Sequence, residues 1–132
     1  MTSLTRYTLL SLIAAFLFGC SGNTDKQRQI EAIAQHRATT LSNSLPIEHG
    51  PLTIMQAKAV GNSVQLMMIY NGETASSAQQ LLEGSIRYYC NNSEVKANLV
   101  HGVIYNIKLR SPRGKLLAER VITENSCAKK AE

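Results

Sequence analysis

Few side chains in this chain have the types and spacings that chemistry requires. The three histidines, His36, His49 and His101, lie in separate segments of the 132 residues, and no two have the spacing of metal ligands. Glu48 and His49 are adjacent and could form an acid–base couple, but such a dipeptide is frequent by chance. The sequence has no G-x-S-x-G, H-E-x-x-H, phosphate-loop or C-x-x-C motif. We therefore predict no enzyme, no cofactor, no metal site and no small-molecule substrate.

The first cysteine, Cys20, follows a segment typical of export. In residues 1–19, Arg6 precedes an apolar run that is too short to span a bilayer, as in a secretory signal peptide. Residues 17–20, LFGC, resemble the bacterial lipobox, in which the cysteine becomes the first mature residue and carries acyl chains. Phe18 departs from the small or hydroxyl residue usual there. The alternatives are an ordinary signal peptide with a chance cysteine and, against the short apolar run, an uncleaved anchor.

The residues after the lipobox indicate where the anchor would be held. Two or more acyl chains hold a protein firmly on a membrane. An Asp after the lipidated cysteine commonly means retention at the inner membrane, so Ser21 favours the outer membrane. Residues 20–27 are small and polar, which predicts a flexible lipidated tether. We expect an outer-membrane anchor with the domain facing the periplasm.

The two other cysteines, Cys90 and Cys127, form an isolated pair. In an exported domain such a pair indicates one disulfide. The alternative is a metal-binding or catalytic thiol, but neither cysteine has a histidine or a second cysteine at ligand spacing. A disulfide would join the residue after the last strand to the end of the second long helix.

Length and charge limit the remaining classes of function. Removal of 19 residues leaves 113, which predicts a single domain over residues 28–127 and a frayed tail over 128–132. The mature chain has 13 basic and 9 acidic residues, and the basic ones are scattered. This pattern does not indicate nucleic-acid binding. With no Trp and few Phe, the chain also lacks aromatic platforms for sugars or single strands.

The periodicity of apolar residues predicts an α+β domain. Two hairpins and three helical segments give the order α-β-β-α-α-β-β, an antiparallel sheet with helices packed on one face and one disulfide. Gly61 and Asn62 form the turn of the first hairpin, and Pro112 and Gly114 lie in the loop of the second. The expected helices are residues 25–44, 76–90 (capped by Ser76 or Ser77) and 93–101, and the expected strands are 52–60, 63–70, 103–110 and 115–123.

The turn lengths predict the strand registers and hence the two faces of the sheet. The first turn pairs Thr53 with Tyr70 and Ile54 with Ile69, and the second pairs Ile107 with Glu119. Helices are expected to cover the more apolar face. The other face then carries apolar residues with a basic rim, which marks a site for a partner helix with acidic positions. Its predicted members are Ile54, Met67 and Ile69, with Lys58, Lys108, Arg110 and Arg120 as the rim.

Two alternatives to this predicted surface stay open. In the first, loops or the first helix of the chain itself cover its apolar residues. In addition, a slip of one residue in either hairpin exchanges the two faces of the affected strand.

The segments SLPIEHGPLTIMQAKAVGNSVQLMMIYN (44–71) and YYCNNSEVKANLVHGVIYNIKLRSPRGKLLAERVI (88–122) resemble the α/β pilotin lipoproteins of type II secretion systems, the AspS-like (GspS-beta) subfamily. The resemblance covers nearly all of the mature chain, including the lipobox and both later cysteines. It implies an α/β fold with one disulfide and an outer-membrane lipoprotein. It also implies a partner, the C-terminal segment of the secretin, which folds as a helix on binding and is drawn to the outer membrane for assembly.

A second class of function stays open at this stage. The chain could be an envelope lipoprotein that acts as a periplasmic inhibitor or a structural binding module. An inhibitor would need a rigid loop with a residue that plugs an active site, and the turn over residues 47–51 is its candidate.

Overall fold

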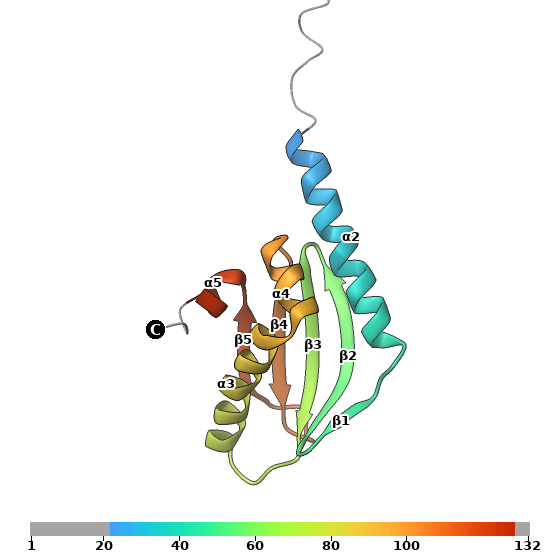
Figure 1. The fold of residues 1–132 in the computed structure, drawn as a ribbon. Helices are drawn as coiled ribbons and strands as arrows, with labels where there is room; N and C mark the ends of the chain where they lie inside the picture. The colour runs from blue at the N-terminus through green and yellow to red at the C-terminus, as the bar shows by residue number, and fades with distance from the viewer. Residues whose placement is uncertain (1–21, 129–132) are drawn as a thin grey trace, which may run out of the picture.

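A computed structural model describes residues 22–128, which form one sheet and the helices beside it (Figure 1). The element order confirms the predicted α+β class, with a short strand added before the first hairpin and a short helix added after the second. The elements in chain order are α2 (Gly22–Ser42), β1 (Ile47–His49), β2 (Leu52–Val60), β3 (Ser63–Tyr70), α3 (Ala75–Asn91), α4 (Ser93–Val100), β4 (Ile104–Arg110), β5 (Leu116–Ile122) and α5 (Glu124–Ala128).

The five strands lie in the order β1-β2-β3-β4-β5, and both predicted hairpins are present. The sheet is mixed, however, because β3 and β4 pair in parallel where we predicted antiparallel strands throughout. The physical reason is the connection: α3 and α4 carry the chain from the end of β3 back to the level of its start, as a parallel pair requires. In the strand order, this parallel pair lies between the two antiparallel hairpins.

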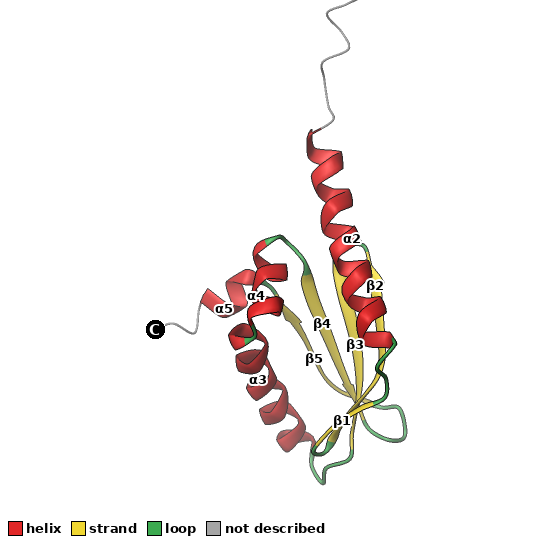
Figure 2. Ribbon diagram, turned by 45° about the vertical axis from the view of Figure 1, so that its right-hand side comes forward, coloured by secondary structure: helices red, strands yellow, loops and turns green. Residues whose placement is uncertain are grey.

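The core lies between the sheet and the helices. In β3 and β4, alternate residues are buried, including Leu66, Tyr105 and Ile107, which expose 2% or less of their surface. α2 packs against β2 and β3, and α3 packs against β5 (Figure 2). Ala34 and Ala38 let α2 approach the sheet closely because their side chains are small. The helices of the described chain thus share one face of the sheet.

The first helix begins earlier than we predicted. Residues 22–27, for which we predicted a flexible tether, are the first turns of α2, and all of residues 22–29 are exposed. Figure 1 shows α2 continuing well past the end of the sheet. Gly102 touches this helix where it leaves the domain, since a Cβ there would lie 3.2 Å from Cδ1 of Ile30. No helix within residues 22–128 is long and apolar enough to cross a membrane.

The caps of the next two helices differ slightly from the predicted ones. Thr74 caps α3 in place of the predicted Ser76 or Ser77, and its side-chain oxygen accepts a hydrogen bond from the backbone N of Ser77 at 3.2 Å. Asn92 ends α3 and caps α4, accepting from the N of Val95 at 3.0 Å. Gly102 follows α4 with φ of +99°, which fits the predicted stop.

The registers follow the predicted turns and then change at a bulge in each hairpin. Gly61, with φ of +57°, makes the first turn, and the pairs from Val60–Ser63 to Gln56–Met67 are as predicted. Met55 is then an extra residue, so Ile54 pairs with Met68 and Thr53 with Ile69.

The second hairpin has the same kind of irregularity. Ser111 and Lys115 are hydrogen-bonded across the predicted loop, and Arg110 pairs with Leu116. Leu117 is the extra residue, and from there Ile107 pairs with Arg120 and not with Glu119. Each bulge exchanges the faces of the residues beyond it, as a one-residue slip must.

The predicted disulfide joins Cys90 to Cys127, with a Cα–Cα distance of 5.4 Å. It ties the end of α3 to α5, the last described element. In the chain-entropy model a closed loop of this length, 37 residues, restricts the unfolded chain considerably.

Replacing both residues, Cys90→Ser with Cys127→Ser, should lower the free energy of unfolding by about 3–4 kcal/mol, because the unfolded chain regains loop freedom. Guanidinium denaturation of the domain without its signal segment measures this. Reduction of the unmodified domain should give the same loss, and Cys20→Ser should give none. A loss below about 1 kcal/mol on breaking the bond would contradict the argument.

Candidate partner-binding site

The face of the sheet away from the helices is the candidate site, and we call it the open face. Its members follow from the register, because residues directly opposite each other on paired strands share a face. Met67 and Ile69 of β3 lie at its centre and are partly exposed. The side chains assigned to this face include Thr53, Gln56, Lys58, Val60, Gln65, Met67, Ile69, Asn106, Lys108, Arg110, Glu119 and Val121.

Five of the seven residues predicted for the partner surface lie together on this face. Met67 is level with Lys108, and Ile69 is level with Arg110, across the parallel pair. Lys58 pairs with Gln65 on the same face. The apolar centre and three of the four predicted cations are therefore adjacent.

The placement of the other two residues on this face was wrong. Ile54 pairs with Met68 on the helix-covered face and packs against the core. Arg120 also lies on the helix-covered side, where its Nε donates to Oε1 of Glu83 in α3 at 2.9 Å. Both errors come from the bulges at Met55 and Leu117.

The bulge in β5 brings two residues to the open face that the sequence analysis missed. Glu119 forms an ion pair with Lys108 at 3.8 Å, so part of the predicted positive charge is neutralised. Val121 pairs with Asn106 and is 49% exposed. The sequence did contain a signal against the predicted register, because that register placed the carboxylate of Glu119 on an otherwise apolar face.

One polar atom on the open face lacks a partner within the described chain. Oδ1 of Asn106 is buried and accepts no hydrogen bond there. A buried acceptor without a donor costs free energy, and its accessible area of less than 1 Å² keeps it out of reach of a partner's donor in this arrangement.

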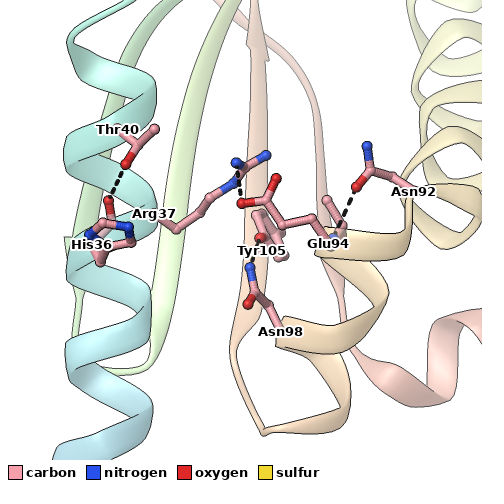
Figure 3. A network of polar contacts seen from close by, with 8 residues as sticks. His36, Arg37, Thr40, Asn92, Glu94, Asn98 and Tyr105 are labelled. Carbon is pink, nitrogen blue, oxygen red and sulfur yellow. Dashed lines mark hydrogen bonds and ion pairs between the residues drawn. The ribbon is translucent and has the colours of Figure 1, made fainter.

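On the opposite side of the sheet, a polar network fastens α2 and α4 to each other and to β4 (Figure 3). Nη1 of Arg37 in α2 contacts Oε1 of Glu94 in α4 at 2.8 Å. Nδ2 of Asn98 donates to the hydroxyl of the fully buried Tyr105 at 3.1 Å. Burial, together with the nearby Tyr105, raises the pKa of Tyr89. We interpret this network as structural, because its contacts hold α2 and α4 in place over the sheet.

The remaining predicted chemical groups stay apart. His36 is exposed on α2, His49 on β1 and His101 at the end of α4. Within the described residues no three His, Cys, Asp or Glu side chains gather as metal ligands would.

A hollow of about 830 Å³ lies beside the disulfide between α3, α4 and α5 and is lined by Arg87, Lys96 and Leu99 among others. The turn considered for an inhibitor is mostly β1, paired with β2. Cys20 lies outside the described residues.

Solved structures show the same fold. The EpsS pilotin of the Vibrio vulnificus type 2 secretion system is 40% identical to this chain, over 79% of this chain and 96% of that one, with a TM-score of 0.74. The type II secretion system pilotin AspS of Vibrio cholerae is 38% identical, over 81% of this chain and 100% of that one, also with a TM-score of 0.74. Pilotin AspS 2 of Escherichia coli O78:H11 is 24% identical over 91% of this chain and 88% of its own length.

The fold, the disulfide and these likenesses define a small α/β component of a bacterial secretion system. The chain belongs to the family described as type II secretion system pilotin, S protein, whose model matches residues 26–127. This confirms the resemblance found in the sequence. The family is defined by a secretion system and is not a class of enzymes.

The assignment of faces can be tested by charge substitution at neighbouring positions of β3. Leu66→Asp should destabilise the domain by more than about 3 kcal/mol, because an unpaired carboxylate would enter the core. Met67→Asp should change the free energy of unfolding by less than about 1 kcal/mol, because its carboxylate would face water. Urea denaturation followed by circular dichroism compares the two variants, and equal losses would refute the assignment.

Proposed function

We propose that this chain escorts a secretin to the outer membrane. In this proposal the domain faces the periplasm and binds the C-terminal segment of a type II secretin, and acyl chains on Cys20 hold the complex on the membrane. The observation that carries the proposal is membership of the pilotin family across the whole domain, residues 26–127. The lipobox also supports it. Acyl chains on Cys20, two residues before the start of α2, would tether the domain to the membrane.

The open face is the surface that we assign to the secretin segment. A helix with its side chains is about 10–12 Å wide, and neighbouring strands are about 4.8 Å apart, so a helix lying on β3 and β4 also reaches β2. Its apolar side would cover Met67 and Ile69. Its flanks would meet Lys58 and Arg110, which favours acidic residues there.

The electrostatic part of this binding should be modest. Lys108 is shared with Glu119, and Arg110 donates from Nη1 to the carbonyl of Gly114 at 2.8 Å. Much of the affinity would then come from the apolar centre, Met67 and Ile69. Ordering of a disordered peptide takes part of the gross interaction energy, so moderate affinity is expected.

Titration of the domain from Ser21 onward with the C-terminal peptide of a type II secretin from the same genome tests the proposed partner. We expect a dissociation constant in the micromolar range or below, with a change of the peptide from coil to helix in circular dichroism. Binding should weaken with added salt, and indifference to salt would remove the basic rim from the mechanism. Absence of binding at high peptide concentration would refute the partner.

Substitution on the open face tests the surface separately from the partner. Met67→Asp with Ile69→Asp should weaken peptide binding at least about tenfold, because two apolar contacts are replaced by repulsive charges toward an acidic helix. Arg120→Ala is the matched control, since this residue lies on the other side of the sheet. Unchanged affinity in the double variant, or an equal loss in the control, would exclude the open face.

Cys20→Ser tests the anchor. The variant should keep its affinity for the peptide, because the substitution lies outside residues 26–127, which the family model matches, but the secretin should no longer reach the outer membrane. Membrane fractionation of cells that produce the variant measures this. Correct localisation of the secretin with the variant would contradict the escort mechanism.

A further inference from the structure

The described part of α2 projects from one end of the domain (Figure 1). Residues 22–29 are exposed on all sides, and Ile30 is the first residue of the helix that is partly covered. At 1.5 Å per residue, the helix rises about 12 Å from Gly22 to Ile30. Gly102 contacts Ile30, so the connection between α4 and β4 is the part of the domain beside the emerging helix.

Hydrogen bonds join the β2–β3 turn to the α4–β4 connection at this end of the domain. Nδ2 of Asn62, in the β2–β3 turn, donates to the carbonyl of Gly102 at 3.0 Å. The N of Ile104 donates to the carbonyl of Asn62, also at 3.0 Å. In both ribbon views the β2–β3 turn and the end of α4 lie at the end of the sheet past which α2 extends (Figures 1 and 2).

The same end exposes apolar side chains next to these hydrogen bonds. Val60 is the last residue of β2 and is 52% exposed, and Val100 is the last residue of α4 and is 58% exposed. Lys26 and Arg28 lie on the exposed part of α2 with Asp25, so the projecting turns carry a net positive charge. Apolar and cationic side chains together are what an interface of anionic phospholipid attracts.

We propose that this end is a membrane-contact surface, in which Val60 and Val100 rest against the phospholipid headgroups while Lys26 and Arg28 pair with their phosphates. The proposal rests on the anchor at Cys20 that the proposed function includes. The position of Cys20, two residues before α2, places the bilayer at this end. The headgroup layer is about 5–7 Å deep on each side, so a tilt of the 12 Å helical projection brings the domain into contact with it.

The consequence is a defined orientation. A flexible segment would let the domain turn freely, whereas a helix continuous with the core fixes which end meets the lipid. The open face, which runs parallel to the strands, then stands upright beside the membrane and stays accessible to a periplasmic partner.

The chain offers a direct optical test, because it contains no Trp and because Cys20 is its only cysteine outside the disulfide. The mature protein is coupled through the thiol of Cys20 to a maleimide lipid in vesicles of phosphatidylethanolamine and phosphatidylglycerol. Single Trp probes are introduced by Val60→Trp, Val100→Trp and, as the matched control, Leu116→Trp. Leu116 is 44% exposed and starts β5 at the opposite end of the sheet.

Quenching of each Trp by spin-labelled headgroups is then measured. The probes at positions 60 and 100 should be quenched severalfold more strongly than the probe at 116 and should emit at shorter wavelength. Equal quenching at the three positions would overturn the proposed contact. Replacement of residues 23–28 by Gly and Ser should reduce the difference, and an unchanged difference would overturn the role of the helix in orientation.

This experiment is independent of the proposed function in its readout. The lipid is attached chemically, so the result does not depend on acylation in the cell. Failure of the secretin proposal would appear in the peptide titration, and failure of the proposed anchor would appear with Cys20→Ser. Neither of these changes the quenching pattern.

Discussion

The parallel pairing of β3 with β4 is the constraint on which the rest of the molecule depends. Two hairpins can form independently, but a parallel pair between them forces the chain to return along the whole length of the sheet before the second begins. The returning segment is α3 and α4, and its apolar side must be buried against the sheet. α2 covers the remaining strands from the same side. All of the large helices are thereby assigned to one face, and the other is left for solvent or a partner.

The two bulges decide which side chains that free face presents. Without the extra residue at Met55, Thr53 would point into the core opposite Tyr70. With it, Leu52 and Ile54 enter the core. In β5 the extra residue turns Ile122 inward, where it is fully buried, and releases Glu119 to pair with Lys108. Burial of apolar area thus selects the bulged registers, and the charge distribution of the open face is a by-product of core packing.

The sequence predicts what is local or periodic in this fold. The Gly61 turn, the loop at Pro112, the order of the elements and the single disulfide follow from turn chemistry, alternation and cysteine count. The parallel pair and the bulges do not, because they are chosen by contacts between residues far apart in the chain. Met67 and Ile69 were placed on the correct face because β3 contains no bulge. Arg120 was placed on the wrong face because it lies beyond the bulge in β5. The start of α2 was missed because its first turns are polar and have no apolar periodicity.

The two edge strands of the sheet, β1 and β5, are poorly suited to pairing with a strand of another molecule. β1 has only three residues, and β5 carries a bulge together with the charges of Glu119 and Arg120. Short, irregular and charged edge strands are poor templates for hydrogen bonding with a strand of another molecule. The short β1 and the irregular, charged β5 therefore disfavour edge-to-edge pairing between copies of this domain.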